Sequence, residues 1–147
     1  MFSKALKELP PFGEAVGMSL DENDLGPGIS VLLPGHPRLA VDEIDQNFHT
    51  GAILAIIDNT AGWCIRDHPD YVEGTSMATL DLRVDFLHAV SVSQTLRVRA
   101  ICEAIDDNVA FVRATAEELE NGLIIATGQA TFMLGTPSGL DVTTGLD

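Results

Sequence analysis

An aspartate inside an apolar segment is the first residue of this sequence whose surroundings suggest chemistry. Asp58 has Leu54 and Ala55 one helical turn before it, and Ala61 and Gly62 one turn after it. An unpaired carboxylate is costly to bury, so Asp58 must be hydrogen-bonded, face an open cleft or lie at a subunit boundary. A structural ion or hydrogen-bond partner would also meet these conditions, so a structural and a catalytic role both stay open here.

A second candidate group stands directly before the same segment. The residues Asn47-Phe48-His49-Thr50-Gly51 place the first free N–H groups of a helix beside a histidine. Such N–H groups, with the partial positive charge of a helix start, suit a developing oxyanion. Asp58 follows His49 by nine residues, or roughly 13 Å of helix, and therefore cannot contact the start of its own helix. If both groups serve one site, a substrate lies between them or a second subunit supplies one half.

The hydrophobic pattern predicts the elements that hold these groups. Residues 50–65 are apolar nearly all round, which is typical of a buried helix at the centre of a fold. Alternation of apolar and polar residues predicts strands, with turns at 106–108 and at Asn121-Gly122; the strands are expected at 14–20, 28–33, 80–86, 96–100, 109–118 and 123–134. A short helix is expected at 2–8, closed by Pro10-Pro11. This order favours an α+β fold, an antiparallel sheet curled around one long buried helix.

Length and composition restrict the class of protein. The 147 residues fit a single domain, with a core at about 12–135 and a loosely ordered tail at 136–147. A net charge of −14 opposes binding to nucleic acid or to an anionic membrane surface. Apolar runs such as 51–57 are too short to cross a bilayer and no signal peptide is visible, so we expect a cytoplasmic protein. We expect reduced thiols at Cys64 and Cys102.

No cofactor or metal site is expected either. His36, His68 and His88 lie at turns or strand ends, without the spacing that would bring them together as metal ligands.

The order and spacing of the candidate groups resemble a known family. His49-Thr50-Gly51, then Asp58, then a strand beginning Thr79-Leu80-Asp81 is similar to the pattern of hotdog-fold acyl-CoA thioesterases of the phenylacetate-pathway type. That family has H-G-G, an Asp or Glu nine residues after the His, and a strand of the form T-x-D-h-x-h-x-F, where h is apolar. The resemblance covers about residues 42–134 and implies one hotdog domain.

The resemblance also implies a role for each matching residue. Asp58 would be the general base or nucleophile that attacks a thioester. Thr50 would donate its backbone N–H to the oxyanion, with His49 supporting that turn. Thr79 would position water and reach the site from the other subunit. The residues expected to bind substrate are Asn47, Gly51, Asn59 and Arg83. The implied protein hydrolyses a small or medium acyl-CoA as a homodimer, or as a homotetramer built from two dimers.

Some positions differ from the family pattern and keep alternatives open. Thr50 replaces a glycine, Glu43 stands where the family has a neutral amide, and His88-Ala89 replaces Arg-Pro. Asn47 could supply the missing amide or could only cap the helix. One alternative is therefore a hotdog protein that binds acyl-CoA or another apolar ligand without turnover.

A second alternative comes from the segment 45–49. Asp45-Gln46-Asn47-Phe48-His49 resembles the D-x-N-P-x-H motif of hotdog enoyl-CoA hydratases, although it is one residue shorter and lacks the proline. Arginines on neighbouring strands leave a further choice, between a solvated face and a basic patch that attracts the CoA polyanion; they are Arg83, Arg97, Arg99 and Arg113.

Overall fold

The segment that is apolar nearly all round forms one long helix, as the sequence predicts. In the computed structural model, which describes residues 10–135, α2 runs Thr50–Arg66 and is 17 residues long. Its buried side chains belong to the core that fills the space between helix and sheet; they are Ile53, Ile56, Ile57, Thr60, Ala61, Trp63, Cys64 and Ile65. The predictions for a helix at 2–8 and a tail at 136–147 lie outside the described residues.

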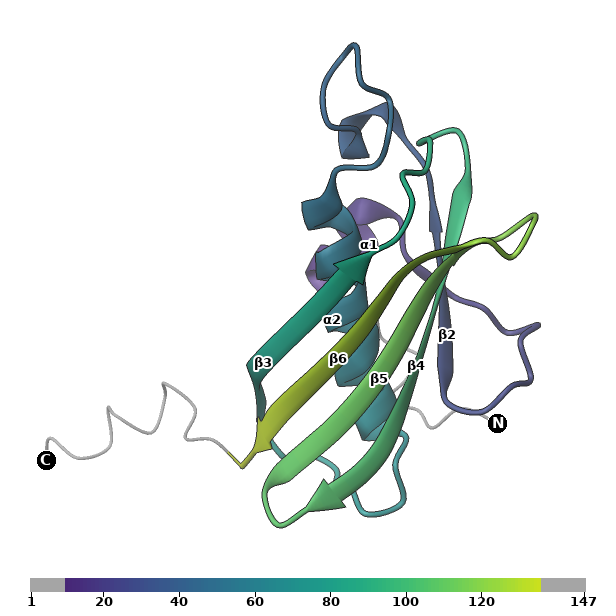
Figure 1. The fold of residues 1–147 in the computed structure, drawn as a ribbon. Coiled ribbons are helices and arrows are strands. Elements are labelled where there is room, and N and C mark those ends of the chain that lie inside the picture. Colours follow the sequence, from purple (N-terminus) through teal and green to yellow (C-terminus); the bar gives the residue numbers. More distant parts are fainter. Residues whose placement is uncertain (1–9, 136–147) are drawn as a thin grey trace, which may run out of the picture.

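Within residues 10–135, six strands form a single antiparallel sheet that curls around α2 (Figure 1). They are β1 (Ser19–Leu20), β2 (Ile29–Pro34), β3 (Met77–Phe86), β4 (Thr95–Asp106), β5 (Val109–Glu118) and β6 (Ile124–Leu134). Their order across the sheet is β1-β2-β4-β5-β6-β3, with every neighbouring pair antiparallel. The predicted α+β architecture, a sheet around one central helix, is confirmed.

The prediction of a strand at 14–20 is wrong for most of that segment. Residues Pro11–Val16 form a short helix, α1, and only Ser19–Leu20 pair in the sheet. Pro11 occupies the first helical position, where a proline has the right φ and the missing N–H costs nothing. Gly17 then ends α1 in the left-handed region, with φ of 86°. The two prolines therefore begin a helix here. A second short helix, the 3-10 helix η2 (Pro37–Leu39), follows β2.

The turn predicted at 106–108 is confirmed, whereas the turn predicted at Asn121-Gly122 is not a two-residue turn. Between β4 and β5 only Asp107 and Asn108 lie outside the strands, and Asp107 has a φ of 55°. Between β5 and β6 the connection spans 119–123, so the predicted two-residue turn at Asn121-Gly122 is part of a longer loop. Both loops lie at the ends of the sheet, away from the middle of α2 (Figure 1).

The two edges of the sheet are unequal, and this matters for the site. The β1 edge is two residues long, whereas β3 forms an edge ten residues long. Most of β3 is exposed, including the apolar residues Leu80 and Phe86. Long exposed edge strands with apolar side chains readily pair with another chain. No helix among residues 10–135 is long and apolar enough to span a membrane.

Candidate active site

A direct hydrogen bond joins the two most informative residues of the sequence. The Thr79 hydroxyl on β3 donates to Oδ1 of Asp58 on α2, at 2.8 Å, within one protomer. The resemblance implied that Thr79 reaches the site from another subunit; the structure places it beside the Asp58 of its own chain. Asp58 is half-buried, so solvent still reaches part of the residue. Asp58 is thus both partnered and partly accessible.

A bulge in β3 turns Thr79 toward the helix. Thr79 pairs with Phe132 and Asp81 pairs with Thr131, so Leu80 is an extra residue between the two pairs. Side chains alternate between the faces of a strand, and an extra residue reverses the alternation beyond it. Leu82 therefore packs against the core, on the same side as Thr79.

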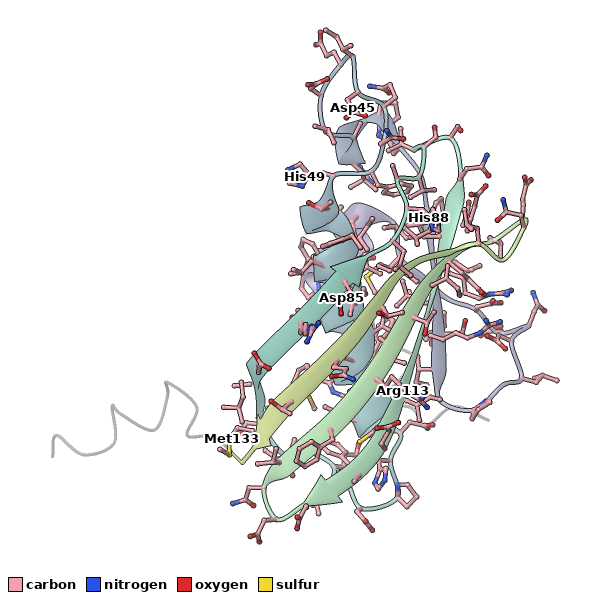
Figure 2. All side chains as sticks on the ribbon, viewed as in Figure 1. Asp45, His49, Asp85, His88, Arg113 and Met133 are labelled. Atoms are coloured by element: carbon pink, nitrogen blue, oxygen red, sulfur yellow. The ribbon has the colours of Figure 1, made fainter. Side chains whose placement is uncertain are left out.

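Arg83 consequently points to the opposite face of the sheet. It lines a shallow depression there with Arg113 and Gln129, and it forms an ion pair with Asp85 at 3.2 Å. Figure 2 shows Asp85 and Arg113 on β3 and β5 of this outer face. The prediction that Arg83 binds substrate is not supported within one protomer, because the sheet separates Arg83 from Asp58.

The surroundings of Asp58 are apolar or small. Leu54 lies one turn before it on α2 and is 40% exposed, and Gly62 lies one turn after it. On β3, Met77 is half-buried and Leu80 is 54% exposed. We refer to this strip between α2 and β3 as the seam. The seam lies along the edge of the sheet, where no other element of residues 10–135 covers it.

The start of α2 holds the second candidate group. His49 is the N-cap, and its Nδ1 accepts a hydrogen bond from the Gly51 N–H at 2.9 Å. The Ala52 N–H donates to the His49 carbonyl oxygen. Thr50 is the first residue of the helix, and within residues 10–135 its N–H donates to no acceptor. The predicted oxyanion donor is therefore free, and His49 holds the turn that presents it.

This turn and Asp58 do not meet within one protomer. Eight helical steps separate Thr50 from Asp58, which is about 12 Å along the axis. Figure 2 shows the His49 ring at the beginning of α2, pointing outward from the body of the molecule. Both groups are exposed or half-buried on a helix that borders the open edge of the sheet. A site that uses both therefore needs either a substrate that spans this distance or a second copy of the chain that supplies one of the groups.

The structure also locates the other residues that were predicted to bind substrate. The Asn59 side-chain amide donates to the carbonyl oxygen of Ala55, on its own helix, at 2.9 Å. Asn47 is half-buried and does not cap α2, because His49 does. Asn47 lies two residues before the cap, in a bridge with Ser91. The structure therefore leaves Asn47 and Gly51 next to the Thr50 turn and Asn59 next to Asp58.

The loop before α2 is stabilised by its own acidic residues. Oδ1 of Asp42 accepts hydrogen bonds from the N–H groups of Ile44 and Asp45, which lowers the pKa of Asp42. The Asp45 carboxylate accepts from the Asn47 N–H at 3.0 Å, and Glu43 is exposed on the same loop. Figure 2 shows Asp45 in the loop beyond His49. This arrangement agrees with a structural loop rather than with an Asp–His pair of hydratase type.

Two arginines that could have formed a patch for CoA are already neutralised. Arg97 contacts Asp21 at 2.9 Å, and Arg99 contacts Asp24 at 2.6 Å. Both arginines also reach Oε1 of Glu117, so the five side chains form one ion-pair network on the outer face of the sheet. The hydrogen bond from Arg99 lowers the pKa of Asp24 to about 2. These arginines attach the loop after β1 and are not free to attract phosphates.

This network makes a prediction about acid stability. The pKa of Asp24 is about 2 in the folded chain, against 3.8 for an ordinary aspartate, the value taken for the unfolded chain. The ion pair of Asp24 therefore stabilises the fold fully above pH 3.8. That contribution is lost as the pH falls from 3.8 toward 2. In urea unfolding, Asp24→Asn should be less stable than the wild type at pH 6, and the difference should shrink toward zero near pH 2. Asp70→Asn, at an exposed aspartate outside the ion pairs, makes the same chemical change without breaking this network and is the matched control.

Sequence reasoning named Gly62 only as a neighbour of Asp58 and did not single out Met77, although the spacing contained a signal that both belong to the seam. Gly62 lies four residues after Asp58, and Met77 lies two residues before Thr79. These spacings place Gly62 on the helix face of Asp58 and Met77 on the strand face of Thr79. A Cβ added at Gly62 would lie 3.6 Å from the Met77 sulfur. The four residues therefore form one continuous strip.

Comparison with known proteins assigns the chain to a family. Residues 45–125 match the model of the thioesterase superfamily. No curated protein matches the chain. Among solved structures, a thioesterase family protein from Silicibacter pomeroyi is 22% identical, with a TM-score of 0.73 over 87% of this chain and 91% of that one.

Two further solved structures have the same fold. A phenylacetic acid degradation-related protein from Ralstonia eutropha is 22% identical, with a TM-score of 0.72 over 86% of this chain and 91% of that one. A thioesterase from Haemophilus influenzae is 16% identical, with a TM-score of 0.72 over 84% and 81% of the two chains.

The sheet curled around α2 is thus a hotdog fold. The chain belongs to the thioesterase superfamily, since the family model covers more than half of its 147 residues.

Proposed function

We propose that this protein hydrolyses the thioester of a small or medium acyl-CoA. The observation that carries the proposal is the Asp58 carboxylate, held by the Thr79 hydroxyl at 2.8 Å in an apolar seam that opens at the sheet edge. Thioester hydrolysis needs an activated nucleophile, a donor for the carbonyl oxygen and an apolar slot for the acyl group. Asp58, the free N–H of Thr50 and the seam supply these three elements.

In the proposed reaction, Asp58 acts on a water molecule. Its free oxygen accepts a proton from the water, whose oxygen forms a bond to the thioester carbon. The negative charge moves to the carbonyl oxygen, where the Thr50 N–H of a second subunit stabilises it. When the carbonyl re-forms, the C–S bond breaks, and the CoA thiolate takes up the proton. If Asp58 attacks directly, the same bond breaks and water then hydrolyses the acyl-aspartate anhydride.

The proposed active unit is a homodimer that pairs through the β3 edge. That edge is ten residues long and exposes Leu80 and Phe86, whereas the β1 edge is only two residues long. Pairing about a two-fold axis would cover both copies of the exposed strand. It would also bring the Thr50 turn of one copy toward the Asp58 seam of the other. A homotetramer of two such dimers and a cytoplasmic location stay predictions of the sequence.

A thiol-release assay tests the proposed function. The purified protein is given acyl-CoAs from acetyl to decanoyl, and the free CoA thiol is measured alongside binding of each compound. Release of thiol with at least one of them supports the proposal. Saturable binding without thiol release would instead show the ligand-binding protein that Thr50 and Glu43 suggested. If no acyl-CoA shows either binding or thiol release, acyl-CoA is excluded as the substrate and as the ligand.

The role of Thr79 predicts a moderate kinetic effect. Its hydroxyl donates to Asp58, and its lone pairs can accept a hydrogen bond from the attacking water. Thr79→Val keeps the shape and the β-branching, so we expect a melting temperature close to that of the wild type and kcat about 10-fold lower. Thr79→Ser retains the hydroxyl and should recover most of the rate. Equal rates for Thr79→Val and the wild type would exclude Thr79 from the mechanism.

A further inference from the structure

The seam does not end at Asp58. One turn further along α2, Gly62 is half-buried and has no side chain, and it faces the sulfur of Met77 and the ring of Phe132. Met77 and Phe132 lie on β3 and β6, which pair directly, with Phe132 opposite Thr79. The part of the seam beyond the carboxylate is therefore lined by a glycine backbone, a thioether and an aromatic ring.

These three residues differ in their freedom to move. Phe132 is 4% exposed and belongs to the core, so its ring forms a fixed floor. Met77 is half-buried, and a methionine has three rotatable side-chain bonds that let it adapt to a neighbouring group. A Cβ placed on Gly62 would meet Met77 at 3.6 Å and Phe132 at 3.9 Å, which is ordinary contact. The space above Gly62 is thus about one methyl group deep while Met77 keeps this position.

The opposite direction along the seam is less suited to an acyl chain. There the residue one turn before Asp58 is Leu54, whose side chain occupies the helix face that Gly62 leaves bare. Leu54 is also 40% exposed, so an alkyl chain beside it would remain partly in water until a partner covers it. The direction toward Gly62 offers a buried ring and a movable apolar side chain. An acyl group attached at Asp58 gains more apolar contact on that side.

We infer that Gly62 and Met77 determine the length of the acyl group that the site accepts. This inference rests on the proposed function. With the thioester carbon at Asp58, the acyl chain enters the space above Gly62, which takes about one methyl group while Met77 keeps this position. A longer chain requires the Met77 side chain to move away from Gly62 and the Phe132 ring. The substrate class is a straight acyl chain that is apolar as far as Met77, because the groups nearest to Gly62 are a thioether and an aromatic ring. Arg66, exposed one turn beyond Gly62, is the first charged side chain further along this helix face.

Gly62→Ala is the sharpest test because it is expected to fold well. The new methyl group makes only ordinary contacts, and alanine is favoured over glycine inside a helix. The melting temperature should therefore be equal to or above that of the wild type. For the longest acyl-CoA that the wild type hydrolyses, kcat/KM should fall by about 10-fold or more, since one methylene in a pocket changes discrimination by roughly 10 to 200-fold. Hydrolysis of acetyl-CoA should fall by much less, so the ratio of the two kcat/KM values is the readout.

Met77→Ala should have the opposite effect on the chain-length profile. Removing the side chain that closes the seam should raise kcat/KM for acyl-CoAs two to three carbons longer than the wild-type optimum by about 10-fold. Met133→Ala is a matched control, because Met133 pairs with Ala78 and so lies on the other face from Met77 (Figure 2). That variant should keep the wild-type profile.

The outcomes separate this inference from the proposed function. If the wild type hydrolyses acyl-CoAs but Gly62→Ala and Met77→Ala both keep its chain-length profile, the inference is wrong and the function stands. A fall of equal size for acetyl-CoA and for long chains would also overturn it, because it would indicate general damage. If the wild type hydrolyses none of the acyl-CoAs, the proposed function fails and takes the inference with it.

Discussion

Asp58→Asn is expected to lower acyl-CoA hydrolysis by about 100-fold or more while leaving the fold intact, because an amide cannot accept the proton of the attacking water. The substitution preserves shape, and the amide oxygen can still accept the hydrogen bond from Thr79. The measurement is kcat and kcat/KM by thiol release, together with the melting temperature. A loss confined to kcat would show that Asp58 acts in the reaction rather than in binding.

A second aspartate, directly after the end of the same helix, provides the control. Asp67 follows the last residue of α2 and is exposed, so Asp67→Asn makes the same chemical change nine residues away from the seam. It should hydrolyse acyl-CoA at close to the wild-type rate. If folded Asp58→Asn were nearly as active as Asp67→Asn, Asp58 would be a structural carboxylate and another nucleophile or base would have to be sought.

The second large effect is expected from mixing two inactive proteins. In the proposed homodimer, each site combines Asp58 of one copy with the Thr50 N–H of the other, since about 12 Å of helix separates these groups within one copy. Asp58→Asn removes one half of each site and a variant at Thr50 removes the other. A heterodimer of the two variants contains one intact site. With equal amounts and free exchange, half of the dimers are mixed, so activity should return to about a quarter of the wild-type value.

Thr50→Pro is the suitable partner for this experiment because it removes the backbone N–H, and the threonine side chain that it also replaces is exposed. Thr50 is the first residue of α2, where proline is well tolerated. His49 has φ of −59° and ψ of 131°, which is the backbone region that a residue before proline prefers. The variant should therefore fold, and loss of an oxyanion donor should lower kcat by about 100-fold.

The same experiment tests the homodimer itself. Sedimentation at micromolar concentration should show no stable species at 15.7 kDa, the mass of one chain. A fully active monomer would contradict the shared site and the pairing through β3. No recovery of activity in the mixture, although both variants are dimeric and exchange subunits, would mean that one copy supplies the whole site.

The elements that hold the site follow from local patterns in the sequence. Residues 50–65 are apolar nearly all round over a length that no ordinary strand has, so the helix is predicted almost to its last residue. Period-two alternation locates β2 through β6, although β4 extends further than expected. The start of the chain is harder, because Pro10-Pro11 can end one helix or begin another. The hydrogen bonds that close α1 at Gly17 show that a helix begins at Pro11.

The candidate groups at the site are determined by the sequence for a related reason. A helix has a fixed rise per residue, so the nine-residue spacing of His49 and Asp58 already excludes contact between them. A carboxylate among apolar neighbours also demands a partner. These arguments need only local geometry. They identify Asp58 and the Thr50 turn without saying what lies opposite either of them.

The tertiary structure determines which side chains face the candidate groups. The extra residue at Leu80 reverses the alternation of β3, which turns Thr79 toward Asp58 and Arg83 to the outer face. Arg97 and Arg99 pair with carboxylates more than 70 residues away, so their spacing on β4 could not show that they are neutralised. Local periodicity reports the face on which a side chain lies. Its partner across a helix–sheet contact depends on register and packing between distant segments, and those exist only in the folded chain.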